Sequence, residues 1–180
     1  MSQTALLVID VQNDYFPQGK MELFCAEQAL KHINRLEDLC IKREQPIIYI
    51  QHIANQPNAT FFQAGTQGVA LHSGLRVKAD SIVIEKNYPN SFFQTTLKAE
   101  LERLNVDKLV ISGMMTHMCI RATTPVAESL GYAPIIISDA TATRDLIVND
   151  ELMPAKQVQE TMLAELSAVA SLMTTNEFLA

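Results

Sequence analysis

The sequence predicts an α/β fold, a three-layer, doubly wound parallel sheet of about six strands with helices on both faces. Short, uniformly apolar runs recur along the chain, as is typical of buried parallel strands. Longer segments between them space their apolar residues as on one face of a helix. This alternation favours right-handed crossovers that cover the sheet on both sides. No internal repeat or linker divides the chain, so we expect one domain over residues 1–180.

Each predicted element follows from its local pattern. Strands are expected at residues 5–9, 46–50, 81–85, 109–112, 134–137 and 168–173. Helices are expected at residues 22–43, 94–104, 119–130 and 154–166. Gly131 would end the third helix, and Pro154 suits the first turn of the fourth. In the strand order 3-2-1-4-5-6, the first and fourth strands flank the point where the order reverses.

Charge and composition exclude several kinds of partner. The net charge is −6, and the basic residues form no stripe that would release counterions from a nucleic acid. They form no polybasic cluster for an anionic membrane, and no apolar run approaches the roughly 20 residues that span a bilayer. Residues 1–4 lack the charged region of a signal peptide, and three cysteines without C-x-x-C spacing suggest no disulfide framework. We therefore expect a cytoplasmic protein with no nucleic-acid or membrane partner.

Three reactive side chains come at or just after the ends of predicted strands: Asp10, Lys86 and Cys119. Because the carboxyl ends of parallel strands share one rim, we expect the three to meet there. Cys119 begins a predicted helix, where the helix dipole and free N–H groups favour a thiolate. Asp10 can take the thiol proton and return it to a leaving group, while Lys86 adds positive charge. The pattern indicates a nucleophilic cysteine.

Each of these residues also has an ordinary structural explanation. An Asp at a strand end often forms a cap or turn, and a Lys there is usually solvated. A lone Cys on a helix is often a small buried hydrophobic residue. Only their joint position at one rim favours a functional site.

The same residues belong to motifs spread over nearly the whole chain. The motifs are LVIDVQNDYF (7–16), GT (65–66), KNYPNSFF (86–93), SGMMTHMC (112–119), SDA (138–140), TRD (143–145) and TTNE (174–177). With these motifs in this order, the chain resembles the isochorismatase-like cysteine hydrolases, which include nicotinamidases and N-carbamoylsarcosine amidohydrolase. The resemblance implies a Rossmann-like sheet. It also implies that Asp10, Lys86 and Cys119 form a catalytic triad that works through a thioester-type covalent intermediate.

The resemblance further implies an unusual turn before Cys119. A non-proline cis peptide bond is expected within residues 113–116, between Met114 and Met115. It would turn the Met115 N–H toward the Cys119 N–H, and the two groups would form an oxyanion hole. The alternative is an ordinary strand-to-helix turn with methionines in the core.

Departures from the family patterns narrow the substrate. Nicotinamidases of the family carry an Asp-x-His metal motif after the second strand, but here the region reads Gln51-His52-Ile53. His52 and His72 remain possible ligands, yet two histidines without a carboxylate fall short of a usual site. We expect no metal and no other cofactor. True isochorismatases cleave a vinyl ether and lack the cysteine, so Cys119 argues against that reaction.

Four residues are candidates for a pocket that binds a small-molecule substrate: Tyr15, Phe16, Phe92 and His117. For the aromatic residues the alternative is a plain core position. For His117 the alternative is helix capping or packing.

Two features of the first half of the chain are assigned to structure rather than chemistry. Cys25 and Cys40 are expected to pack on the first helix. The long irregular stretch at residues 51–78 is expected either to shape specificity or to lie at a subunit interface. Relatives are usually homo-oligomers, so a homo-oligomer is expected here.

The leading hypothesis is a hydrolase that attacks a small amide, or a related carbonyl compound, through Cys119. Isochorismatase-type or nicotinamidase-type hydrolysis is the alternative within the family. A thiol redox enzyme is a second class, but no nearby resolving cysteine accompanies Cys119. A catalytically silent binding protein is a third, and the intact triad argues against it. A dinucleotide site is not favoured, because no G-x-G-x-x-G follows the first strand.

Overall fold

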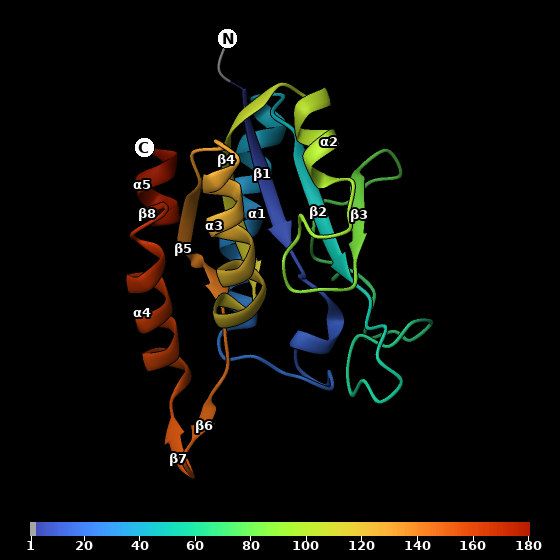
Figure 1. The fold of residues 1–180 in the computed structure, drawn as a ribbon. Helices are drawn as coiled ribbons and strands as arrows, with labels where there is room; N and C mark the ends of the chain where they lie inside the picture. The colour runs from blue at the N-terminus through green and yellow to red at the C-terminus, as the bar shows by residue number, and fades with distance from the viewer. Residues whose placement is uncertain (1–2) are drawn as a thin grey trace.

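A parallel six-stranded sheet forms the centre of the molecule in the computed structural model, which describes residues 3–180 (Figure 1). Its strands are β1 (Gln3–Ile9), β2 (Ile47–His52), β3 (Ile82–Lys86), β4 (Val106–Met114), β5 (Ile135–Ala142) and β8 (Ser171–Met173). The order is β3-β2-β1-β4-β5-β8, and every neighbouring pair is parallel. This confirms the predicted 3-2-1-4-5-6 arrangement, with β8 as the sixth strand.

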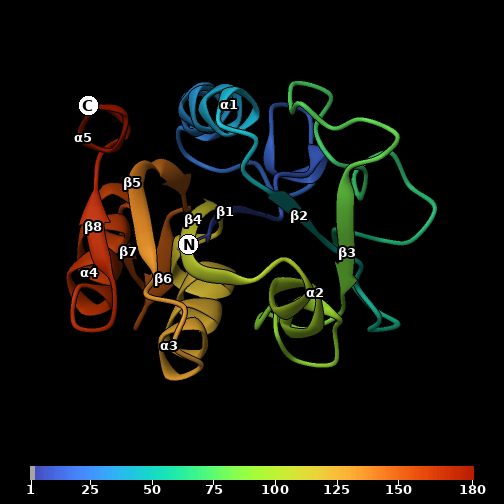
Figure 2. The same cartoon turned by 90° about the horizontal axis from the view of Figure 1, so that it is seen from above.

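Helices cover both faces of this sheet, which makes the fold a three-layer, Rossmann-like α/β structure (Figure 2). The helices are α1 (Ala26–Lys42), α2 (Leu97–Arg103), α3 (Arg121–Ser129), α4 (Ala155–Leu166) and α5 (Thr175–Leu179). Helices α1 and α5 lie on one face, and α2, α3 and α4 lie on the other. No helix in the described part of the chain combines the length and the hydropathy needed to cross a bilayer.

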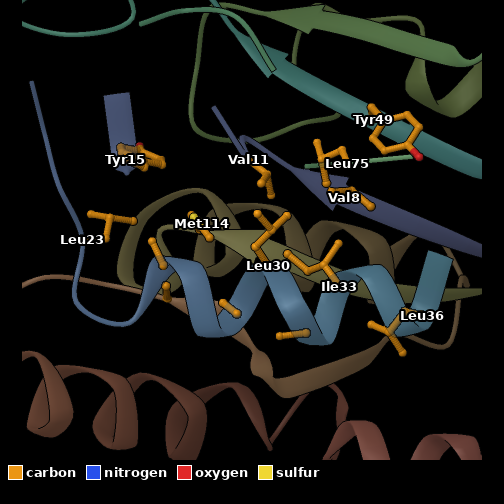
Figure 3. Close-up of a cluster of buried hydrophobic side chains, with 14 of the residues drawn as sticks. Val8, Val11, Tyr15, Leu23, Leu30, Ile33, Leu36, Tyr49, Leu75 and Met114 are labelled. Carbon is orange, nitrogen blue, oxygen red and sulfur yellow. The ribbon is translucent and has the colours of Figure 1, made fainter. Parts of the chain in front are cut away.

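The strands are buried on both faces, which explains their uniformly apolar sequences. In β1, Leu6 and Val8 belong to the cluster under α1, whereas Leu7 and Ile9 belong to the cluster on the opposite face. All four are at most 1% exposed. Figure 3 shows the first cluster, in which α1 side chains lie opposite residues of β1 and β2, with Leu30, Ile33, Leu36, Val8 and Tyr49 among those labelled.

Gly113 fixes the relative position of the ends of β1 and β4. It pairs with Ile9 in the register of the two strands. Its φ is +118°, and a Cβ at this position would overlap the Ile9 carbonyl oxygen. Only glycine has the conformational freedom and the small size for this close approach. The chain segments that follow the two strands are therefore held next to each other.

Several short elements were not expected from the sequence. A hairpin of β6 (Leu146–Val148) and β7 (Glu151–Met153) extends beyond the carboxyl ends of the central strands (Figure 1). Its turn residues, Asn149 and Asp150, both have positive φ, and Asn and Asp adopt this conformation in tight hairpin turns more readily than most residues. The helix α5 was also missed, although Thr174 and Glu177 form a capping box at its start. A 3₁₀ turn, η1 (Asn13–Tyr15), follows β1.

Three predicted helix starts were wrong. The second helix begins at Leu97 rather than at residue 94, because Gln94 has a left-handed conformation with φ of 54°. The first helix begins at Ala26 rather than residue 22, because Cys25 has a left-handed conformation with φ of 60°. The helix expected to begin at Cys119 is preceded by a π-helical turn, η2 (Thr116–Ile120), and α3 begins only at Arg121. Cys119 thus lies inside η2.

Candidate active site

Asp10, Lys86 and Cys119 lie together beyond the carboxyl ends of β1, β3 and β4. Asp10 follows β1 directly, with φ of 52°, a left-handed conformation that Asp adopts more readily than most residues. Lys86 is the last residue of β3, and Cys119 comes from η2 after β4. The three residues are 0%, 1% and 3% exposed. Buried ionisable groups are rare unless they are paired, so their surroundings matter.

The Lys86 ammonium group is the centre of the cluster. Its Nζ lies 2.8 Å from Asp10 Oδ2 and donates to Cys119 Sγ at 3.3 Å. It also donates to the carbonyl oxygen of Tyr88 at 3.0 Å. The structure therefore brings the carboxylate, the ammonium and the sulfur into contact.

His52, the last residue of β2, completes the cluster. Its Nδ1 lies 2.8 Å from Lys86 Nζ and 3.8 Å from Asp10 Oδ2. Burial, and next the positive charge of Lys86, lower the His52 pKa to about 4. The ring is therefore neutral at neutral pH, and Nδ1 accepts a hydrogen bond from Lys86. The sequence drew attention to His52 only as a possible metal ligand, although its position at a strand end was the same signal that identified Lys86.

The free protein holds Cys119 as a thiol. Burial raises the pKa of the Cys119 thiol, the Asp10 charge raises it further, and Lys86 lowers it only in part. The expected helix start at Cys119 was wrong, and in this site burial and the Asp10 charge favour the thiol over the thiolate. Burial alone would lower the pKa of Lys86, but Asp10 and Cys119 outweigh that effect and raise it. Lys86 is therefore positively charged.

The turn before Cys119 has an unusual backbone. The Met114–Met115 peptide bond is cis. In η2, the Met115 carbonyl oxygen accepts hydrogen bonds from the N–H groups of Met118 and Ile120. Met118 and Ile120 are the residues before and after Cys119 in sequence. The Met115 oxygen therefore accepts from the N–H groups of both neighbours and not from the Cys119 N–H.

A cavity of about 350 Å³ lies beside the cluster. His52 and Met118, the neighbour of Cys119, both line it. Most other lining side chains are aromatic, amide-bearing or small: Ala54, Asn55, Gln56, Asn58, Ala59, Thr60, Phe61, Phe62, Asn87, Tyr88 and Pro89. Apolar walls with a few polar groups are typical of sites for small molecules.

The irregular segment after β2 supplies much of this cavity and is held by two buried side chains near β1. The Gln12 side chain accepts from the His52 N–H at 2.8 Å and donates to the carbonyl oxygens of His52 and Val69, both at 2.8 Å. Asp14 Oδ2 accepts from the Phe62 N–H at 2.7 Å. Of the two roles expected for residues 51–78, this position favours specificity; an interface role stays a prediction.

The four predicted pocket residues have different surroundings. Tyr15 is buried and packs against Phe62, with ring centroids 4.6 Å apart, beside the cavity wall. Phe16 is buried in the cluster under α1, and Phe92 stacks on Tyr132. Neither of these two lines the cavity described above, and a contact of either one with substrate stays a prediction.

His117 lies outside this cavity as well. Its Nδ1 is 2.6 Å from Thr143 Oγ1, and it lines a separate cavity of about 260 Å³. Burial lowers its pKa. The hydrogen bond to Thr143 corresponds to the packing alternative rather than to a contact with the triad.

A metal site is a second possible use of the cluster. Potential ligand atoms of Asp10, His52 and Cys119 lie within 4.8 Å of one another, so the carboxylate missing from the sequence motif comes from another strand. His72 is not part of this group; its Nδ1 accepts from the Gly74 N–H, and its ring packs on Phe16. The Lys86 ammonium already contacts all three potential ligands, and a metal would have to compete with this fixed positive charge. The donor set does not favour a metal.

The other two cysteines differ in their surroundings, and all three are free. Cys40 is a buried residue of α1 and packs in the cluster between α1 and the sheet, as expected. The expectation that Cys25 is a packing residue on the first helix was wrong: it is exposed, and its left-handed conformation places it before α1 begins. Cys40 and Cys119 belong to clusters on opposite faces of the sheet, so neither cysteine of this pair can resolve the other.

Comparisons with known proteins agree with this architecture. The family model described as "Isochorismatase domain" matches residues 4–177. The isochorismatase family protein YddQ of Bacillus subtilis is 42% identical over 177 residues, which cover 98% of each chain. The nicotinamidase of Escherichia coli is 27% identical over 176 residues, covering 77% of this chain and 83% of that protein.

Among solved structures, an isochorismatase-type protein from Oleispira antarctica superposes with a TM-score of 0.94 and 37% identity. The match covers 99% of this chain and 96% of that one. The fold, the six-stranded order and these relatives agree over nearly the full length. The chain therefore belongs to the isochorismatase family of hydrolases.

Proposed function

We propose that this chain hydrolyses the C–N bond of a small amide, or a related carbonyl compound, through a covalent acyl-enzyme on Cys119. Asp10 is the general base and acid, and Lys86 is the electrostatic partner. The observation that carries this proposal is the contact of Lys86 Nζ with both Asp10 Oδ2 and Cys119 Sγ in a buried site.

The first half of the reaction forms the acyl-enzyme. Because Cys119 is held as a thiol, its proton has to leave when the sulfur attacks, and the neighbouring Asp10 carboxylate accepts it. The sulfur bonds to the carbonyl carbon, and the carbonyl oxygen takes negative charge. The N–H groups of Met115 and Cys119 are the proposed donors to that oxygen. Asp10 then returns the proton to the leaving nitrogen, the C–N bond breaks, and a thioester remains.

The second half reverses these roles with water. Asp10 removes a proton from a water molecule, whose oxygen attacks the thioester carbon. The C–S bond breaks, the acid product leaves, and the proton on Asp10 returns to the sulfur. Lys86 keeps its charge throughout and stabilises whichever of the two neighbouring groups is negative.

The cavity beside His52 is the proposed place for the rest of the substrate. Its aromatic walls suit a flat or apolar part, and its amide side chains suit hydrogen-bonding groups. The nicotinamidases among the relatives support amide hydrolysis as the reaction class. A single domain, a cytoplasmic location and a homo-oligomeric state stay predictions.

The test is a screen of small primary amides against the natural protein and Cys119→Ala, with intact-mass spectrometry of reactions stopped by acid. We expect an adduct whose mass equals the acyl part of the substrate, on the natural protein only. Turnover should fall by at least about 10³-fold in the variant. The matched control, Cys25→Ala, should form the adduct and turn over within about twofold of the natural protein. Turnover that survives in Cys119→Ala would reject the proposed nucleophile.

A further inference from the structure

His52 is a half-buried group that touches the triad, and the proposed reaction gives it no role. The register of β2 and β3 pairs it directly with Lys86. The ends of β2 and β3 thus place the His52 ring, a hydrogen-bond acceptor, next to the Lys86 ammonium. Any role of His52 in the reaction rests on the proposed function of Cys119 as the nucleophile.

A lysine requires more positioning than the other members of the triad. Its ammonium group is a point charge on a flexible four-carbon stem, and each of its three N–H bonds needs an acceptor when it is buried. Lys86 is 1% exposed, so water is not the main partner. The acceptors at 3.0 Å or less are Asp10 Oδ2, His52 Nδ1 and the Tyr88 carbonyl oxygen. These three atoms can direct the ammonium while it also faces Cys119 Sγ at 3.3 Å.

We propose that His52 is a positioning residue that holds the Lys86 ammonium between Asp10 and Cys119 by accepting one of its N–H bonds at Nδ1. The role requires a neutral ring with its proton on Nε2. A charged imidazolium would donate rather than accept, and it would place a second positive charge 2.8 Å from Lys86.

The surroundings of His52 are built for one fixed ring position. Its backbone N–H and carbonyl both bond to the fully buried Gln12 side chain. Its ring packs beside Phe62, with centroids 5.8 Å apart, and Asp14 holds the Phe62 backbone. The charged or titratable groups that face the ring are Lys86 from β3, Asp10 after β1 and Cys119 from η2. The Lys86 charge favours the neutral ring, and the Asp10 charge favours the protonated ring more weakly.

The experiment compares His52→Leu with His52→Asn. Leucine removes the acceptor, whereas the side-chain oxygen of asparagine takes the place of Nδ1 and cannot titrate. The readout is the rate at which iodoacetamide alkylates Cys119 at several pH values, resolved from Cys25 and Cys40 by peptide mass spectrometry. A second readout is kcat and KM of each variant, measured with an amide that the screen identifies as a substrate.

We expect His52→Leu to lower kcat and the rate of Cys119 alkylation near neutral pH by about 10- to 100-fold. The KM should change by a smaller factor than kcat, although His52 also lines the proposed substrate cavity. His52→Asn should stay within about threefold of the natural protein in all readouts. The matched control is His32→Leu. His32 also lies beside a carboxylate, with Nδ1 3.4 Å from Asp139 Oδ2, but it is on α1 and does not contact the triad. This control should leave Cys119 alkylation unchanged.

A double-mutant cycle separates positioning from general damage to the fold. If His52 acts only through Lys86, then adding His52→Leu to Lys86→Met should not slow Cys119 alkylation further. Additive losses would overturn the proposal, as would a His52→Asn variant as impaired as His52→Leu. Equal alkylation in His52→Leu and the natural protein would overturn it too.

Two safeguards keep the test decisive. If His52→Leu fails to fold, ¹⁵N NMR of the natural protein at pH 7 reports the tautomer directly, and a proton found on Nδ1 would overturn the proposal. The alkylation readout does not depend on turnover. Amide hydrolysis that persists in Cys119→Ala would therefore reject the proposed function, while the effect of His52 on the Cys119 sulfur would still be measured.

Discussion

Two cysteines lie near helix starts in this protein, and their surroundings are opposite. Cys25 is the residue before α1 and is exposed. It lines a cavity of about 270 Å³ together with Lys156 and Glu160. Cys119 lies in η2 before α3, is 3% exposed, and touches Lys86. A helix start alone therefore does not make a nucleophile. The neighbours brought by other strands make the difference.

The comparison also shows why the proposed nucleophile needs a base. An exposed thiol can lose its proton to solvent, but burial and the Asp10 charge raise the pKa of the Cys119 thiol. In the proposed mechanism, Asp10 therefore has two effects: its charge favours the thiol before attack, and its carboxylate accepts the thiol proton during attack.

The largest effect is expected from Asp10→Asn, which removes the neighbour that most distinguishes Cys119 from Cys25. Amide turnover should fall by about 10²- to 10⁴-fold because the proton acceptor is lost. The Cys119 pKa should fall at the same time, because the Asp10 charge raises it. The pH dependence of alkylation at Cys119 measures this, with Cys25 in the same sample as the internal reference. A Cys119 pKa that rises in this variant would contradict the electrostatic assignment.

Gly113→Ala should disrupt the turn that presents Cys119. The new methyl group would overlap the Ile9 carbonyl oxygen at a φ of +118°, so we expect a loss of about 3 kcal/mol or more in the free energy of unfolding. Gly131→Ala is the control, because φ there is also positive, at +87°, but nothing lies within 4 Å of the added Cβ. It should cost only about 1 kcal/mol. Equal losses in urea denaturation would mean that the close approach of β1 and β4 does not matter.

The pH dependence of stability should reveal the lowered pKa of His52, which lies beside Cys119 and not beside Cys25. The His52 pKa is about 4 in the folded protein against an ordinary value of 6.5. Between these values the unfolded chain binds a proton that the folded protein does not, so stability falls as the pH falls from 6.5 toward 4. The full contribution is about 3 kcal/mol. Urea denaturation from pH 7 to pH 4 measures it, and His52→Asn should lose this part of the slope.

The smallest effect is expected at the other cysteine. Cys25→Asn places a residue that tolerates the left-handed conformation at an exposed position, so the free energy of unfolding should change by less than about 0.5 kcal/mol. Amide turnover should not change. A large loss of activity would show that the region around Cys25 takes part in the reaction.

The sequence was sufficient to predict the sheet and the triad residues, but not the surroundings of the site. The apolar runs were sufficient to predict the sheet and its order, because parallel strands buried on both faces need such sequences. The position of Lys86 after one of these runs was sufficient to place it at the rim with Asp10 and Cys119. The chain around the site was harder to read, because Phe61 and Phe62 lie in an irregular segment whose path depends on the buried side chains of Gln12 and Asp14.

The surroundings of two predicted pocket residues could not be read from the sequence for a similar reason. Phe16 and Phe92 flank the triad motifs in sequence, yet both pack in hydrophobic clusters, since the direction of an aromatic side chain after a strand is set by its tertiary contacts. His52 was visible in the sequence, but its partner in the register of β2 and β3 was not, so its hydrogen bond to Lys86 was missed.

By itself, the sequence determined the layered sheet, its strand order and the three reactive residues at one rim, because hydrophobic periodicity and strand ends are local properties. The tertiary structure alone decided the protonation of Cys119, the place of His52 and the walls of the cavity. Desolvation and charge depend on atoms that lie far apart along the chain, and no local pattern records them.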